Sequence, residues 1–219
     1  METSIILETI IKVVVVLAVF SALAGFTTYI ERKVLAFMQR RLGPTNVGPY
    51  GLLQIAADGI KLFTKEDFIP ANACKPIFKI APIITAATAF IAMSAVPFFP
   101  EFEMFGYTVK PIISDINVGV LFVMSVGAVG LYGPLLGGMS SANKWALLGG
   151  ARTAIQLLSY EVVSGLSLLA PLMMVGSLSL IDINNYQSGG VSDWIIWSQP
   201  LAFILFTIAG FAETNRTPF

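Results

Sequence analysis

The chain has 219 residues, of which 56% are hydrophobic and only 12% are charged, and its formal net charge is zero. A soluble globular domain carries about twice that charged fraction, so the composition argues against a soluble protein. A chain without net charge also offers no basic field for nucleic acid. It has no histidine and one cysteine, Cys74, which excludes a disulfide within the chain and an iron–sulfur cluster held by this chain alone. No cluster of metal ligands is visible, so any redox centre belongs to a partner chain.

Five apolar runs predict an all-α integral membrane protein with five transmembrane helices in a single domain over residues 1–219. A helix that crosses a bilayer needs about 17–25 predominantly apolar residues, and each run is near that length. The first run is too long for a cleaved signal peptide, and acidic Glu2 and Glu8 precede it where a signal peptide has positive charge. The expected spans cover residues of about 5–30, 78–99, 117–136, 153–175 and 194–213.

Residues 31–77, between the first two spans, form the only long polar-rich segment. It begins with Glu31-Arg32-Lys33, where the first helix is expected to leave the membrane. Gly43-Pro44 and Gly48-Pro49 follow, and Gly51 comes shortly after the second pair. Each proline fixes its own φ and biases the preceding residue away from the helical region, so these pairs predict a constrained turn.

The end of this segment predicts an amphipathic helix at about residues 50–66, on the cytoplasmic side of the membrane. Its polar residues Gln54, Asp58, Lys61 and Lys65 are spaced four, three and four apart, so they form one line along one face. Two interpretations stay open. The helix lies in the membrane interface with this polar line in water, or the line faces a cavity lined by protein.

The basic residues of the loops predict the orientation of the chain. The first loop, through Lys79, contains eight Lys and Arg residues, whereas the second contains only Lys110 and the fourth contains none. The third loop contains Lys144 and Arg152. Because cytoplasmic loops are enriched in Lys and Arg, the amino terminus is expected outside and the loop 31–77 in the cytoplasm.

Two carboxylates are candidates for proton or charge transfer. Glu161 lies near the middle of the fourth apolar run, on the side away from Arg152, with no basic residue three or four positions away. A carboxylate within a span is costly and is a functional candidate by default, although a structural bond to another helix is the alternative. Glu213 ends the fifth run, three residues before Arg216, so an ordinary ion pair is a strong alternative there.

Three segments together resemble one family, the quinone-site (heel) membrane subunit of NADH:quinone oxidoreductase, respiratory complex I. The resemblance extends from the first span to the last residue. It is carried by ERKVLAFMQRRLGPTNVGPYGLLQIAADGIKLFTKE, SSANKWALLGGARTAIQLLSYEV and FAETNRTPF. One departure is that the family pattern continues beyond Phe219 into an acidic loop and about three more spans, so the resemblance implies a truncated chain.

The resemblance implies a membrane subunit that forms the quinone entrance channel, docks the hydrophilic arm and couples quinone reduction to proton pumping. Quinone is then the substrate, and NADH, FMN and iron–sulfur clusters are bound by partner subunits. The implied partners are the quinone-site and terminal iron–sulfur subunits of the hydrophilic arm, and the small and antiporter-like membrane subunits. The implied location is an energy-transducing membrane, the bacterial plasma (inner) membrane.

The resemblance also assigns roles to seven residues. It implies quinone-channel or coupling roles for Arg32, Arg40, Asp58, Lys61 and Lys65. It implies that Glu161 and Glu213 belong to a proton or charge relay that leads from the quinone chamber.

Three other interpretations stay open at this point. The nearest is the homologous membrane subunit of an energy-converting hydrogenase or ferredoxin-linked complex, which binds no quinone. A transporter or channel belongs to another class, and the absence of a visible internal repeat argues against many transporter folds. A purely structural assembly subunit is the third.

Overall fold

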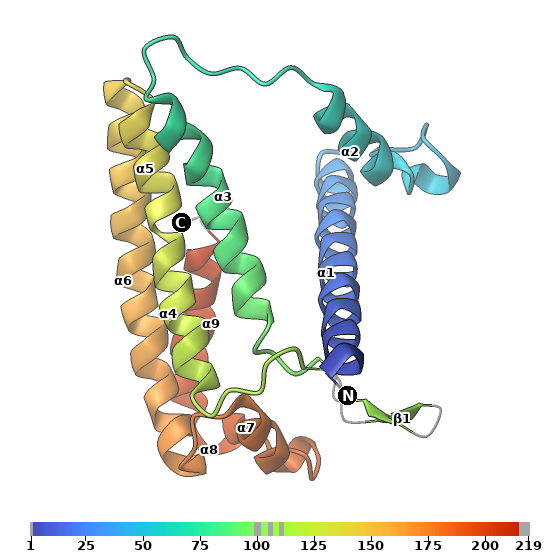
Figure 1. Ribbon diagram of the computed structural model, residues 1–219, viewed down its shortest axis with the longest axis vertical. Coiled ribbons are helices and arrows are strands. Elements are labelled where there is room, and N and C mark those ends of the chain that lie inside the picture. The colour runs from blue at the N-terminus through green and yellow to red at the C-terminus, as the bar shows by residue number, and fades with distance from the viewer. Residues whose placement is uncertain (1, 99–101, 105–106, 110–111, 215–219) are drawn as a thin grey trace. The chain divides into compact units, whose positions relative to one another are not determined.

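The computed structural model describes residues 2–98, 102–104, 107–109 and 112–214. The chain divides into two compact units, Met1–Phe68 and Ile69–Phe219. Helices make up almost all of the regular structure in both units, which confirms the predicted all-α class (Figure 1). A short antiparallel pair of strands in the second unit was not predicted.

The first unit consists of a long helix, α1 (Glu2–Met38), a single 3₁₀ turn (Pro49–Gly51) and a shorter helix, α2 (Gln54–Thr64). Residues 8–38 of α1 are long and apolar enough to cross a membrane. Helix α1 continues about two turns beyond residue 30, where the first span was expected to end. Arg32 and Lys33 therefore lie on a helix, where their side chains have a fixed spacing.

The turn before α2 explains why this helix begins at Gln54 and not near residue 50. Tyr50 and Gly51 have φ values of 54° and 80°, in the left-handed region that ends helical geometry. A Cβ atom added to Gly51 would overlap the carbonyl oxygen of Pro44, so both the conformation and the space at this position require glycine. The Gly-Pro pairs thus form the constrained turn that the sequence predicts, and α2 begins four residues later than the expected start at about residue 50.

The second unit is a bundle of helices with a short strand pair. Strands β1 and β2 are antiparallel, with Glu103 opposite Thr108. The elements in chain order are α3 (Lys75–Met93), β1 (Phe102–Met104), β2 (Tyr107–Val109), α4 (Gly119–Gly130), α5 (Tyr132–Ser140), α6 (Lys144–Val175), α7 (Leu180–Tyr186), a 3₁₀ turn (Val191–Asp193), α8 (Ile195–Ser198) and α9 (Pro200–Glu213).

Small residues allow the helices of this bundle to approach closely. Helix α3 packs on α4 and α5, and α6 packs on α5 and α9. A Cβ atom on Gly133 of α5 would overlap the Thr85 hydroxyl of α3, and Gly138 of α5 faces Gly150 of α6. Helices in membranes associate through such small-residue contacts, because lipid provides no hydrophobic drive to bring them together.

Three segments of the second unit are long and apolar enough to cross a membrane: Lys75–Met93, Gly119–Ser140 and Lys144–Val175. The expected fifth span is divided, because Gln199 separates α8 from α9 with φ −131° and ψ 55°. Pro200 disfavours helical geometry in the residue before it and has no N–H for a helix bond. Helix α9 has 14 residues, or about 21 Å, against the roughly 30 Å of a bilayer core.

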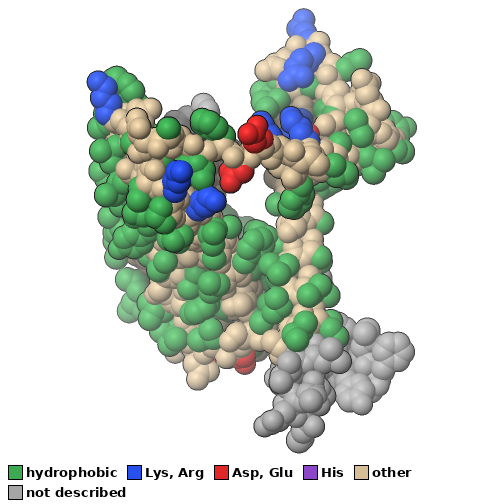
Figure 2. Space-filling model, turned by 45° about the horizontal axis from the view of Figure 1, so that its top comes forward, with side chains coloured by type: hydrophobic (Ala, Val, Ile, Leu, Met, Phe, Trp, Pro, Cys, Tyr) green, Lys and Arg blue, Asp and Glu red, His purple; other side chains and the backbone are tan. Residues whose placement is uncertain are grey.

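Basic residues gather at one end of the second unit. The amide of Cys74 donates to the carbonyl of Ser140 at 2.9 Å, so the start of α3 lies beside the end of α5 and near the start of α6. Lys75, Lys79, Lys144 and Arg152 all lie in the first three turns of α3 and α6. The face in Figure 2 shows hydrophobic side chains, in green, over most of the flank of the bundle. Basic side chains at one end and hydrophobic side chains along the flank are typical of a helix bundle whose flank lies in lipid.

Candidate functional site

The first group of site residues is an ion pair between the two helices of the first unit. Arg32 of α1 donates from Nη1 to Oδ2 of Asp58 on α2, at 2.5 Å. Gln54 lies one turn before Asp58 and donates from Nε2 to the other carboxylate oxygen at 3.1 Å. The bond from Gln54, followed by that from Arg32, lowers the pKa of Asp58 below its ordinary value. Asp58 is therefore held ionised and oriented at neutral pH.

The predicted polar line of α2 divides into two halves. Gln54 and Asp58 are half-buried and face α1, whereas Lys61 and Lys65 are exposed. The first half thus contacts α1, and the second half extends past that contact; whether the line faces a cavity lined by protein stays a prediction. Arg40 follows the end of α1 in a left-handed conformation with φ 52°, and it is exposed. The structure does not bring Arg40, Lys61 or Lys65 into hydrogen-bonding contact with Asp58.

Tyr29 belongs to the same contact, and sequence reasoning missed it. Its hydroxyl donates to the carbonyl oxygen of Tyr50 at 2.8 Å, which joins α1 to the turn before α2. Its position three residues before Arg32, on the same face of α1, is a signal that could have identified it. Nothing local in the sequence indicates its partner, which lies 21 residues away.

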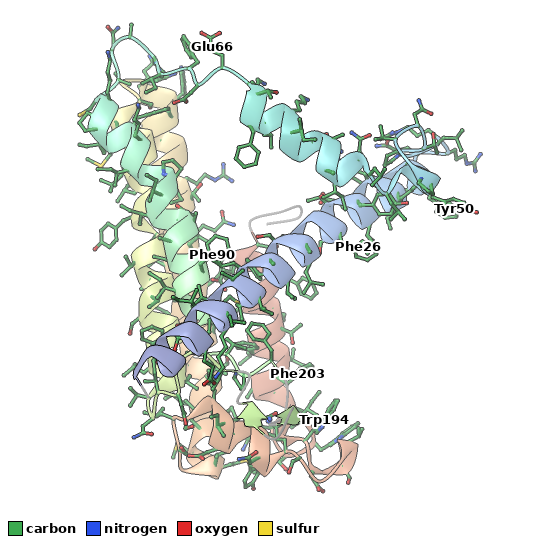
Figure 3. All side chains as sticks on the ribbon, turned by 45° about the vertical axis from the view of Figure 1, so that its right-hand side comes forward. Phe26, Tyr50, Glu66, Phe90, Trp194 and Phe203 are labelled. Carbon is green, nitrogen blue, oxygen red and sulfur yellow. The ribbon has the colours of Figure 1, made fainter. Side chains whose placement is uncertain are left out.

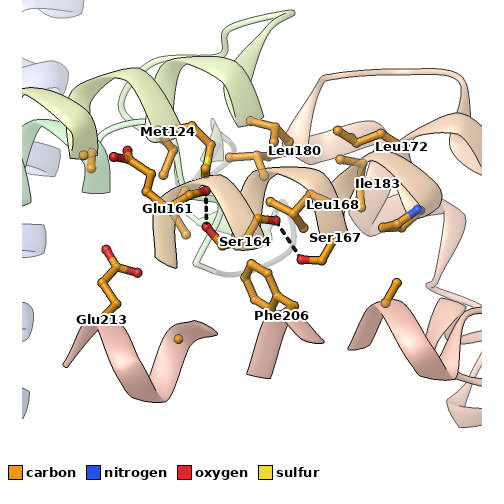
Figure 4. Close-up of a pocket in the computed structure, with 18 of the residues that line it drawn as sticks. Met124, Glu161, Ser164, Ser167, Leu168, Leu172, Leu180, Ile183, Phe206 and Glu213 are labelled. Carbon is orange, nitrogen blue, oxygen red and sulfur yellow. Dashed lines mark hydrogen bonds between the residues drawn. The ribbon is translucent and has the colours of Figure 1, made fainter. Parts of the chain in front are cut away.

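The second group lies in a cavity within the second unit. The cavity has a volume of about 880 Å³ and is lined mostly by apolar side chains of α3 to α9. Glu161 of α6 and Glu213 of α9 both line it, and Figure 4 shows their carboxyl groups on the same side of the cavity. Leu157 and Leu168 line it with Glu161, as helical spacing predicts for this face of α6.

Two serine hydroxyl groups lie along α6 in the turns that follow Glu161. Ser164 donates to the carbonyl of Glu161 at 2.9 Å, and Ser167 donates to that of Ser164 at 2.7 Å (Figure 4). Both serines are buried and line the cavity. A hydroxyl that donates its proton still has two lone pairs that can accept a hydrogen bond. The arrangement places two ionisable groups and several hydroxyls in an apolar enclosure. Arg216, the suggested partner of Glu213, lies outside the described residues.

Neither group is a metal centre of a familiar kind. Across the parts of the chain that the structure describes, no three His, Cys, Asp or Glu side chains come together as metal ligands. Cys74 is exposed at the start of α3. The first group is thus an ion pair between Arg32 and Asp58, and the second is a pair of carboxyl groups, Glu161 and Glu213, that line one cavity.

Comparisons with known proteins give a consistent result. The sequence profile of the NADH dehydrogenase family matches residues 11–219. A relative from Wolinella succinogenes is 78% identical over 217 residues, which cover 99% of this chain and 66% of the relative. A relative from Nitratiruptor sp. is 74% identical, and the match covers 100% of this chain and 66% of the relative. A relative from Helicobacter pylori strain G27 is 65% identical, and the match covers 98% of this chain and 65% of the relative. All three carry the same name, that of one subunit of NADH-quinone oxidoreductase.

The chain spans about two thirds of the length of these curated relatives. The match covers both units, including the helices that hold the Arg32–Asp58 pair and the cavity with Glu161 and Glu213. Together with four helices long and apolar enough to span a membrane, the match shows that the chain belongs to the NADH dehydrogenase family.

Proposed function

We propose that this chain is the quinone-site membrane subunit of a proton-translocating NADH:quinone oxidoreductase. The observation that carries the proposal is the 78% identity, over almost the whole chain, to a relative named as a subunit of NADH-quinone oxidoreductase. The chain contributes to the quinone entrance channel, docks the hydrophilic arm and couples quinone reduction to proton pumping. NADH, FMN and the iron–sulfur clusters are bound by partner subunits, which fits a chain with no histidine and one cysteine.

The contact between Arg32 and Asp58 supports the channel part of this proposal. It fixes opposite charges within the last two turns of α1, after the apolar run that was expected to end at residue 30. A polar group at that level can meet a quinone headgroup that arrives from lipid, and the exposed Lys61 and Lys65 continue the polar surface along α2. Arg40, beyond the end of α1, adds a further cation to this side of the unit. We assign these five residues to the quinone entrance.

The cavity supports the coupling part. Glu161 and Glu213 line one apolar enclosure, and the structure describes no Lys or Arg among its lining residues. Two carboxylates in one apolar space favour a shared or exchanged proton, because both cannot easily carry charge together. We therefore assign Glu161 and Glu213 to the proton or charge relay.

The charge distribution supports an orientation in the bacterial plasma membrane. In the second unit Lys75, Lys79 and Lys144 lie at one end, whereas Asp182 and Asp193 lie among the elements at the other. Because basic residues are enriched on the cytoplasmic side, the end with the lysines faces the cytoplasm, as does the loop 31–77. The amino terminus then lies outside.

The proposal is tested with the full-length subunit in the assembled complex. Asp58→Asn removes the charge that Arg32 contacts, and Lys61→Ala removes the next cation along α2. We expect both variants to lower quinone-dependent NADH oxidation per assembled complex. Lys12→Gln is the control, because it breaks another ion pair on α1, with Glu8 at 2.7 Å, far from the entrance. Wild-type activity and assembly in both entrance variants would contradict the assignment.

A further inference from the structure

The way in which α2 is held on α1 depends on three contacts with different chemistry. Arg32 pairs with Asp58 near the middle of α2. Gly25 of α1 leaves room for Ile55, since a Cβ atom there would lie 2.6 Å from the Ile55 methyl carbon Cγ2. The third contact is the hydrogen bond from the Tyr29 hydroxyl to the carbonyl of Tyr50. Of the three, it is the third that restrains the turn preceding α2.

That turn needs a restraint because its backbone is unusual. Tyr50 adopts φ 54° and ψ 14°, which is a left-handed conformation. This conformation is unfavourable in free energy for any residue that carries a side chain. Gly48 and Gly51, on either side, also have positive φ values, of 72° and 80°. Glycine adopts a positive φ without steric cost, so it is Tyr50 whose conformation persists only where surrounding contacts determine it. The Tyr50 side chain, labelled in Figure 3, is 82% exposed, so it contributes little of that determination.

The ring of Tyr29 is itself well placed by its neighbours on α1. Phe26 stacks against it with a centroid distance of 6.2 Å, and the Lys33 amino group lies 5.7 Å from the ring centroid. These residues are three and four positions away, so they lie on the same face of the helix. The hydroxyl is therefore presented to the turn by a ring that is held on two sides.

We propose that Tyr29 is a positioning residue for the quinone entrance: its hydroxyl clamps the turn at Tyr50 to α1. The clamp sets where α2 starts, and so it sets how Asp58 meets Arg32 and where Lys61 and Lys65 point. This role rests on the proposed quinone function, but the clamp itself does not. Tyr29 acts through the turn and does not need to touch quinone.

The test uses Tyr29→Phe in the full-length subunit within the assembled complex. The variant removes the hydroxyl and keeps the ring, so packing against Phe26 is retained. We expect amide hydrogen exchange of the peptide covering residues 48–57 to increase by about two- to tenfold, the range that corresponds to one net hydrogen bond. We also expect the KM for quinone to rise several-fold while kcat stays within about twofold, since the reaction chemistry is untouched.

Tyr132→Phe is the matched control, because Tyr132 is 57% exposed on α5 of the other unit and lies outside this contact. It should leave both exchange at residues 48–57 and the KM unchanged. Unchanged exchange in Tyr29→Phe would overturn the clamp, whatever the quinone kinetics show. Faster exchange with an unchanged KM would overturn the positioning role. Failure of the quinone function itself would appear separately, as normal quinone kinetics in Asp58→Asn.

Discussion

At the scale of single residues, the carboxyl groups of the two units have different surroundings. Asp58 accepts hydrogen bonds from Gln54 and Arg32, which together satisfy both of its carboxylate oxygens. Glu161 lies in an apolar cavity with Glu213, without a cation among the described lining residues. The first environment keeps a carboxylate ionised, whereas the second is the one to which we assign the proposed relay. The two carboxylates should therefore respond differently to substitution.

Asp58 should not titrate in the physiological range. Its pKa is lowered in the folded protein, so the contribution of its contacts to stability is complete above the ordinary pKa of about 3.9. That contribution is lost only as the pH falls through the lowered folded value. We therefore expect the activity ratio of Asp58→Asn to wild type to be constant between about pH 6 and pH 8. A ratio that changes steeply in this window would show that Asp58 titrates there.

Glu161→Gln keeps the shape and hydrogen-bonding capacity of the side chain but cannot ionise. If Glu161 relays protons, we expect the complex to assemble while quinone reduction and proton pumping fall together, by about tenfold or more. Glu161→Asp keeps a carboxyl group and should retain more activity. The measurement is NADH oxidation and pumping per assembled complex. Wild-type turnover and pumping in the Gln variant would rule out an essential role for ionisation of Glu161.

At the scale of elements, the sequence predicts periodic features well and long-range contacts poorly. The polar line on α2 and the cavity-facing side of α6 both follow from helical spacing, and the structure contains them. The pairing of Arg32 with Asp58 spans 26 residues, and no local pattern specifies it. The division between α8 and α9 had a local signal in Pro200, but the apolar composition of residues 194–213 concealed it. The apolar composition of a segment indicates that it lies in lipid, whereas a single residue such as Pro200 determines where the helix breaks.

The turn before α2 offers a test of how far a single glycine determines an element. Gly51→Ala places a Cβ atom against the Pro44 carbonyl at a positive φ, so we expect a loss of about 1–3 kcal/mol in stability. Gly59→Ala is the matched control, because it lies inside α2 and its Cβ atom would meet nothing within 4 Å. The control should be neutral or stabilising by up to about 1 kcal/mol. Thermal unfolding of the purified complex measures both, and equal stability of the two variants would contradict this account of the turn.

At the scale of the whole molecule, the chain is apolar along its helices, and its basic residues lie mainly in the loop 31–77 and near the starts of α3 and α6. Four helices can cross a membrane by length and composition, and α9 is a shorter apolar helix. The family match covers both units, so the polar contact and the cavity both lie in the part of the chain that the family shares. The positions of the basic residues predict that orientation.

Labelling of single cysteines from one side of the membrane tests the orientation, on a Cys74→Ser background. We expect an impermeant reagent outside intact cells to modify a cysteine at position 188, between α7 and α8. A cysteine at position 64, at the end of α2, should react only after the cells are opened. Modification of both positions from outside would contradict the predicted topology.

Photoaffinity labelling with a light-activated quinone analogue tests the central claim most directly, because it maps where quinone meets this chain. The assembled complex is irradiated with the analogue, and the modified peptides are sequenced with and without an excess of natural quinone. We expect modification within residues 29–65, around the contact of Arg32 with Asp58, and we expect excess quinone to suppress it. Modification confined to other parts of the complex, or modification of residues 29–65 that quinone does not suppress, would contradict the claim that this unit forms the quinone entrance.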